Sequence, residues 1–149
     1  IKDDSGIMLG CSAIVTDLRL LPECYQQAKR AILFGKNFAV TPKIHFYSRF
    51  IEQGIIYHSI GTYEHEIVTQ KIILPIKHYD EKYEAELWAT LIKCLFAKSL
   101  ENAASDLHIH SSTLRYRLQR IKDLTDVDFF SPHGNFLLKL AYIITAIDS

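Results

Sequence analysis

The stretch SLENAASDLHIHSSTLRYRLQRIKDL, which spans residues 99–124, decides the fold of this chain. Its pattern predicts two helices joined by a tight turn. Ser99 is expected to cap the first helix, because its hydroxyl can accept a hydrogen bond from an unpaired backbone N–H. Apolar residues recur in this helix at helical spacing, and we expect them to be buried: Leu100, Ala103, Ala104 and Leu107. The two adjacent alanines leave room for a second helix to cross closely.

The turn is expected over residues 108–112. Ile109, its one apolar residue, can enter the core beneath the turn, and Ser111 or Ser112 can cap the helix that follows. This second helix is expected to begin near Thr113. One side of it is an apolar stripe made of Leu114, Leu118, Ile121 and Thr125. The opposite side is polar and carries Arg115, Tyr116, Gln119, Arg120 and Lys122.

The charge of the second helix points to a partner. Residues 111–124 hold four cations and one anion, a local net charge of +3. A short support helix, a turn and a basic helix that can lie in the major groove are the layout of a DNA-binding helix-turn-helix. An ordinary helical hairpin with a solvated basic face has the same local pattern. The alternative function is therefore a non-enzymatic protein-interaction module, in which the basic helix meets an acidic partner.

The candidate DNA-binding residues are His110, Ser111, Ser112, Arg115, Tyr116, Gln119, Arg120 and Lys122. Three of them are expected to reach base edges or nearby phosphates: Arg115, Gln119 and Lys122. Four are expected to position the helix on the DNA backbone: Ser111, Ser112, Tyr116 and Arg120. Arg117 lies at the margin of the apolar stripe, and we expect it to be structural. Because one helix-turn-helix reads only a short half-site, a homodimer is expected.

Residues 109–124, IHSSTLRYRLQRIKDL, resemble the C-terminal helix-turn-helix of bacterial PucR/CdaR-type transcription regulators. Further matching motifs are Leu74-Pro75-Ile76, His78-Tyr79-Asp80, Glu86-Leu87, Thr90-Leu91, Asp128-Phe129 and Leu138-Lys139-Leu140-Ala141. The resemblance implies a cytoplasmic regulator of purine catabolism or sugar-diacid use that binds double-stranded DNA. Its small-molecule effector would be sensed by a region outside this chain. The family often has Arg-Asn where Ser111 and Ser112 stand, so no operator sequence is implied.

Residues 1–50 predict a strand, a helix and a second strand. The strands are expected over residues 7–15 and 43–47, with Gly10 at a bulge or a close approach and a turn at Thr41-Pro42. The helix is expected to place Pro22 in its first turn and to end at Gly35. Its predicted buried face consists of Leu21, Tyr25, Ala28 and Ile32, with Ala31 beside them. The unit resembles the tail of a degenerate GGDEF-like regulatory domain, and it lacks the Gly-Gly-acidic-acidic loop of a diguanylate cyclase.

The remaining chain predicts helices. Residues 48–73 are expected to be helical in two pieces broken near Gly61, and Pro75 is expected to interrupt the pattern. Asp80 and Glu81 are expected at the start of a helix, where acidic groups are favourable. The apolar stripe of that helix would contain Tyr83, Leu87, Leu91, Cys94 and Leu95, with Trp88 off its centre. The last helix, near residues 135–147, is apolar nearly all round, which is typical of a core or an interface.

These elements predict a mainly α fold, in which a helix-turn-helix domain follows a small α+β remnant. The expected domains are residues 1–50, the partial GGDEF-like domain, 51–78, a helical linker, and 79–149, the DNA-binding domain. Since the chain begins with Ile1 rather than Met, we expect it to be a fragment of a longer protein.

Composition excludes several classes of function. The net charge is zero, so attraction to nucleic acid must come from a local patch. Three cysteines without a C-x-x-C favour reduced thiols over a disulfide scaffold or a zinc site. His108 and His110 lack a further ligand at metal-binding spacing, and no nucleotide-binding glycine motif is present. No apolar run reaches membrane-spanning length. We therefore expect no metal, no cofactor, no catalytic residue and no membrane association.

Overall fold

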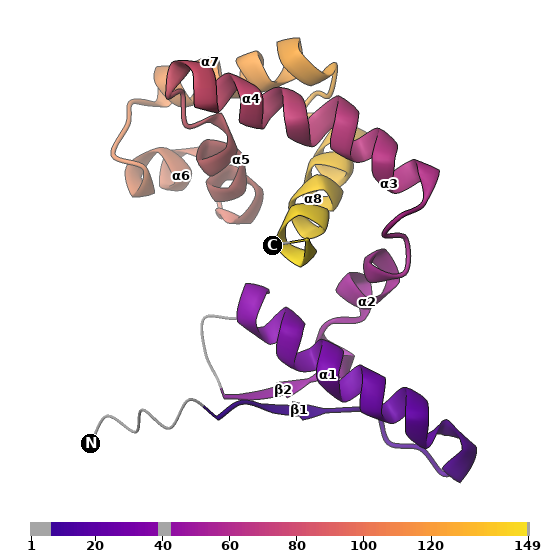
Figure 1. The fold of residues 1–149 in the computed structure, drawn as a ribbon. Coiled ribbons are helices and arrows are strands. Elements are labelled where there is room, and N and C mark those ends of the chain that lie inside the picture. The colour runs from indigo at the N-terminus through magenta and orange to yellow at the C-terminus, as the bar shows by residue number, and fades with distance from the viewer. Residues whose placement is uncertain (1–6, 39–42, 149) are drawn as a thin grey trace. The chain divides into compact units, whose positions relative to one another are not determined.

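The computed structural model describes residues 7–38 and 43–148 and divides the chain into two compact units. The N-terminal unit contains residues 1–58 with 146–149, and the C-terminal unit contains residues 59–145. Helices dominate both units, and the described residues include one small sheet (Figure 1), so the predicted fold class is confirmed. None of the described helices combines the length and the apolar character that a membrane span requires.

The N-terminal unit is built around two parallel strands, β1 (Leu9–Cys11) and β2 (Ile44–Phe46), with helix α1 (Leu21–Phe38) between them in the chain (Figure 1). Short 3₁₀ turns, η1 (Leu18–Leu20) and η2 (Tyr47–Arg49), and helix α2 (Ile51–Tyr57) complete it. The strand–helix–strand order is as predicted. The first strand is much shorter than the predicted range of residues 7–15, and the predicted Thr41-Pro42 turn lies outside the described residues.

Two glycines let α1 lie directly on the sheet. A Cβ atom on Gly10 would stand 2.0 Å from the carbonyl oxygen of Ala28, which confirms the predicted close approach. A Cβ atom on Gly35 would stand 2.3 Å from the ring of His45 on β2. The prediction that Gly35 ends the helix is wrong, since α1 continues to Phe38. Gly35 instead makes space for the buried imidazole.

The predicted buried face of α1 is also wrong at its N-terminal end. Leu21 and Tyr25 are 55% and 64% exposed, while the buried residues are Ala31, Phe34 and Gly35. The reason is length: a helix of 18 residues extends about 27 Å, whereas strands of three residues extend about 10 Å. Only the part of α1 from about Ala28 onward therefore has a sheet to pack against.

The C-terminal unit begins with a long rod made of α3 (Tyr63–Val68), a π-helical turn η3 (Thr69–Ile73) and α4 (Leu74–Tyr83) (Figure 1). The predicted break near Gly61 is confirmed, and Gly61 has a positive φ of 84°. The prediction that Pro75 interrupts the helix is wrong. In η3 the N–H of Leu74 bonds to the carbonyl of Thr69, five residues earlier. Because this π-helical turn is wider than an α-helical one, Pro75, which has no N–H, can continue the helix directly after it.

The prediction that Asp80 and Glu81 start a helix is wrong, because both residues lie in the last turn of α4. The chain then reverses through Glu84 and Glu86, both in left-handed backbone conformations, into α5 (Leu87–Phe96). The Asp80 carboxylate accepts hydrogen bonds from the backbone N–H groups of Leu87 and Trp88, at 2.7 and 2.8 Å. The carboxylate of Asp80 therefore caps α5, although Asp80 itself belongs to α4.

Helix α5 buries the stripe that the sequence predicted, except for one residue. The buried members are Leu87, Leu91, Cys94 and Leu95, with Thr90 among them. Tyr83 belongs to α4 and is exposed, so its place in the stripe is wrong. Burial raises the pKa of the Cys94 thiol to about 11, which makes it a small apolar side chain in practice.

Three further helices complete the described chain: α6 (Leu100–Asp106), α7 (Ser111–Thr125) and α8 (Pro132–Ile147). Helices α5 and α7 pack against each other, and both pack against α4 and α6. Helix α8 begins three residues before its predicted start, with the Ser131 hydroxyl accepting from the N–H of Gly134 at 2.9 Å. It buries Leu138 and Ala141, while Phe136 is 65% exposed.

Candidate nucleic-acid interface

Helix α6 and the turn after it follow the sequence closely. The Ser99 hydroxyl accepts from the N–H of Asn102 at 3.2 Å, which confirms the predicted cap. Ala103 and Ala104 are buried as predicted, whereas the flanking leucines are only half-buried. The helix ends with His108 in a left-handed conformation, φ 54°, and with the N–H of Ile109 donating to the carbonyl of Ala104. This is the Schellman motif, in which glycine usually takes the place of His108.

Helix α7 begins differently from the prediction. It starts at Ser111, and its cap is His110 rather than a serine. The ring nitrogen Nδ1 of His110 accepts from the N–H of Ser112 at 3.2 Å and lies 2.8 Å from the Ser112 hydroxyl. Because the imidazole already reaches this amide, both serines enter the first turn. Histidine is not among the preferred capping residues, so composition gave no signal for this role.

The buried stripe of α7 fixes which way the helix faces. Leu114, Leu118 and Ile121 are at most 1% exposed, as predicted, and Thr125 is half-buried. Because these residues lock the helix onto its neighbours, the opposite stripe faces outward. The candidate residues exposed on it are Ser111, Ser112, Arg115, Tyr116, Gln119 and Lys122.

Some of the outward side chains of α7 already have hydrogen-bond or ion-pair partners within the protein, and others do not. The Gln119 amide donates to Asp123 at 2.9 Å, and the Lys122 ammonium lies 2.9 Å from a carboxylate oxygen of Asp128. That hydrogen bond raises the pKa of Lys122 and lowers the pKa of Asp128. Arg115 makes no hydrogen bond or ion pair with the residues that the structure describes. The uncommitted positive charge is therefore in the first half of α7.

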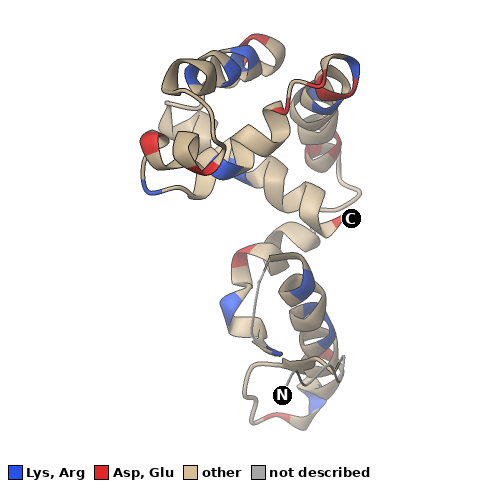
Figure 2. Ribbon diagram, turned by 90° about the vertical axis from the view of Figure 1, so that its left-hand side faces the viewer, with Lys and Arg blue, Asp and Glu red and all other residues tan. Residues whose placement is uncertain are grey.

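One acidic side chain, Glu101, interacts electrostatically with Arg115. Glu101 on α6 has a lowered pKa, caused first by hydrogen bonds to its own backbone N–H and to Ser99, and least by the charge of Arg115. Lys and Arg residues occur on several helices of the C-terminal unit, with Asp and Glu residues between them (Figure 2). A DNA-binding patch must therefore be local, as the zero net charge also requires.

Two arginines of α7 are held by residues far away in the sequence. Arg117 donates to Thr90 at 2.9 Å and to Glu86 at 3.0 Å, which agrees with its predicted structural role. The guanidinium of Arg120 lies 4.7 Å from the ring centre of Tyr79 on α4. Sequence reasoning missed Tyr79 and Glu86, because no local spacing relates them to α7.

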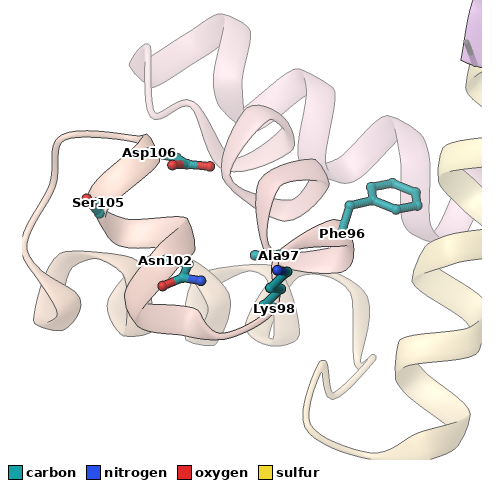
Figure 3. Close-up of a pocket in the computed structure, with 6 residues that line it drawn as sticks. All are labelled: Phe96, Ala97, Lys98, Asn102, Ser105 and Asp106. Atoms are coloured by element: carbon teal, nitrogen blue, oxygen red, sulfur yellow. The ribbon is translucent and has the colours of Figure 1, made fainter. Parts of the chain in front are cut away.

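A shallow depression lies beside the junction of α5 and α6 (Figure 3). Its lining residues are Phe96, Ala97, Lys98, Asn102, Ser105 and Asp106. Phe96 points away from the polar side chains of α6, which do not surround one common point (Figure 3). None of the candidate DNA-binding residues lines it. Among the residues that the structure describes, no group of three or more His, Cys, Asp or Glu side chains could hold a metal ion.

Comparison with known proteins agrees with this geometry. Residues 87–144, from the start of α5 into the last turn of α8, match the model of the PucR C-terminal helix-turn-helix domain. The chain is also 27% identical over 148 residues to the DNA-binding transcriptional activator AdeR of Bacillus subtilis (strain 168). That match covers 93% of this chain and 33% of the relative, so the chain spans about a third of the relative's length.

The match supports the predicted resemblance in the part of the chain that it covers, residues 87–144. The match to the helix-turn-helix domain does not reach residues 1–50, so the assignment of these residues to a GGDEF-like domain stays a prediction. The expected boundaries at residues 50 and 78 stay predictions as well.

Proposed function

We propose that this chain binds double-stranded DNA through α7, as the helix-turn-helix part of a bacterial transcription regulator. The observation that carries the proposal is the division of α7 into two faces. Its buried stripe fixes the helix in the unit, and its outward stripe presents a basic and polar surface. Two similarities support it: the match of residues 87–144 to a PucR helix-turn-helix domain, and the similarity to AdeR, a DNA-binding transcriptional activator.

The pairing of side chains suggests a division of roles along α7. In helix-turn-helix proteins, residues near the start of the recognition helix contact base edges. Arg115 lies in this half and is uncommitted, so we assign it to a base, with guanine the natural partner of its fork of donors. Gln119 and Lys122 would exchange their contacts with Asp123 and Asp128 for contacts with DNA. Lys122 would meet a phosphate, and the other backbone contacts fall to His110, Ser111, Ser112, Tyr116 and Arg120.

We further propose the context in which this binding operates. The protein would be a non-enzymatic, cytoplasmic regulator of the purine-catabolism or sugar-diacid type, with its effector sensed outside this chain. It would bind as a homodimer, because two half-sites about 34 Å apart give a longer readable sequence than one. Light scattering with and without the best DNA site tests this. A chain that stays monomeric at high concentration on that site would remove the dimer.

The test of the main proposal is selection from a library of random DNA duplexes, using the 149-residue chain. We expect an enriched sequence and an affinity that falls steeply with salt, since each neutralised phosphate contributes about 0.9 to the slope of log K against log salt. Absence of both enrichment and salt-dependent binding would reject DNA binding. In that case the protein-interaction module, which uses the same basic helix, becomes the better account.

A further inference from the structure

Tyr79 lies outside the segment that matches the helix-turn-helix domain, yet it contacts the proposed DNA-binding helix. It belongs to α4, which packs against α7. The guanidinium carbon of Arg120 stands 4.7 Å from the centre of its ring, well within the range of a cation–π contact. The proximity of Tyr79 is also the largest cause that raises the pKa of Arg120. The pair is therefore a cation–π contact between α4 and α7.

The ring of Tyr79 is itself held in place. It lies 4.6 Å from the ring of Tyr83, one turn further along α4, and Lys82 covers Tyr83 at 5.0 Å. Arg120 is 4.0 Å from a carboxylate oxygen of Asp123, at the limit of an ion pair. Its Nε atom is buried and has no hydrogen-bond partner among the described residues. Tyr79 is thus the aromatic side chain that supports this guanidinium from a neighbouring helix.

The side chain of Arg120 is still 38% exposed. A guanidinium has five N–H donors in a fixed plane, so a ring against one face leaves donors at its edge for another partner. On the proposed function, that partner is a phosphate oxygen of the DNA backbone. An unsupported arginine would have to be ordered when DNA binds, whereas a stacked one is already in position.

We infer that Tyr79 is a positioning residue for DNA binding, which holds the Arg120 guanidinium at the edge of the outward face of α7 for contact with a phosphate. The inference rests on the proposed function and adds a residue from outside the matched domain to it. Tyr79 would thus support the DNA-binding surface from α4 through Arg120, without touching DNA itself.

The test is a double-mutant cycle with Tyr79→Leu, Arg120→Ala and the double variant, titrated against a fluorescein-labelled duplex of mixed sequence. We expect Tyr79→Leu to weaken binding about threefold to fivefold, as loss of one cation–π contact would. The salt slope should stay near that of the wild type, because Arg120 is still present. Arg120→Ala should weaken binding more and lower the slope by about one unit. In the Arg120→Ala background, Tyr79→Leu should have no further effect.

Three variants guard against a merely structural explanation. Tyr79→Phe keeps the ring and should bind nearly as the wild type does. Arg120→Lys keeps the charge but not the planar stacking, so it should weaken binding as Tyr79→Leu does, and it tests the contact if Tyr79→Leu fails to fold. Tyr25→Leu removes a similar contact, with Lys29 at 5.6 Å in the other unit, and should change nothing.

Wild-type affinity for Tyr79→Leu, or an equal loss with and without Arg120, would overturn the inference while leaving DNA binding intact. Wild-type affinity for Arg120→Ala would overturn it as well, because Arg120 would then not contact DNA. Failure of the wild type to bind duplex DNA at any salt concentration would reject both this inference and the proposed function.

Discussion

The two units of the chain bury their apolar side chains to different degrees. In the C-terminal unit, residues such as Leu91, Leu114 and Ile121 are at most 1% exposed. In the N-terminal unit, α1 covers one face of the two-stranded sheet, while Leu9 and Ile44 on the other face are 54% and 44% exposed. Parallel sheets are ordinarily covered on both faces. The N-terminal unit therefore has the weaker core by itself.

This difference bears on where a binding surface can be fixed. Side chains that recognise a ligand are held accurately when their element is locked by packing and by capped ends. Helix α7 satisfies both conditions, with a buried stripe on one side and caps at His110 and Asp126. The N-terminal unit has no comparable set of buried stripes among its described residues. We therefore assign the binding function to the better packed unit.

Separating the units should have the largest effect. Residues 1–50 expressed alone should not fold cooperatively, since one helix on a two-stranded sheet buries too little apolar surface. Residues 59–149, prepared in the same way, should show a cooperative thermal transition. Circular dichroism and NMR dispersion measure both. A sharp transition with native-like dispersion for residues 1–50 would contradict the prediction, because the sheet and α1 would then fold without further packing partners.

Single truncations in the two units should differ several-fold. Leu118→Ala removes a fully buried side chain from α7 and should lower the free energy of unfolding by about 2–5 kcal/mol. Leu9→Ala, on the exposed face of the sheet, should cost at most about 0.5 kcal/mol. Urea denaturation followed by the fluorescence of Trp88 measures the cost in the C-terminal unit, and followed by circular dichroism it measures the cost in both units. Similar costs for both variants would contradict the difference in packing.

The cap that Asp80 provides should contribute measurably to the C-terminal unit. Asp80→Ala leaves the N–H groups of Leu87 and Trp88 without their acceptor and should cost about 1–2 kcal/mol. Glu81→Ala, at the neighbouring exposed position, is the matched control and should be nearly neutral. Thermal unfolding of the two variants tests this. Equal melting temperatures would mean that the cap does not stabilise α5.

A substitution at His108, in the turn between α6 and α7, should increase the stability of the C-terminal unit. His108 has a left-handed backbone conformation, which costs a residue with a side chain about 1 kcal/mol relative to glycine. His108→Gly should therefore raise the stability of the C-terminal unit by up to about 1 kcal/mol. His133→Gly, in the first turn of α8, should instead destabilise it slightly. A lower melting temperature for His108→Gly would show that the imidazole has a role besides filling this position.

What the sequence predicted well was local. The support helix and the buried stripe of α7 follow from spacing within a few residues, because each depends on the period of one helix. The turn is shorter than predicted, since α7 begins at Ser111, and Ile109 is half-buried rather than in the core. The direction in which Arg115 and Gln119 face follows from that stripe. The same reasoning failed for α1, where Leu21 and Tyr25 have helical spacing but no sheet opposite them.

What it could not predict depends on contacts between separate elements. The prediction that Asp80 starts a helix is wrong, because Asp80 ends α4 and caps a helix that begins seven residues later. Pro75 continues a rod because a π turn precedes it, and His110 caps α7 in place of a serine. The support of Arg120 by Tyr79 joins side chains that no periodicity relates.

The central claim is that the first half of α7 reads bases, and titration of Arg115→Ala against matched and single-mismatch duplexes tests it most directly. We predict weaker binding and the loss of about 1–3 kcal/mol of discrimination at one position of each half-site. Lys122→Ala, the control, should weaken binding to all sequences about equally and lower the salt slope by about one unit. Unchanged affinity and preference for a folded Arg115→Ala protein would contradict the claim.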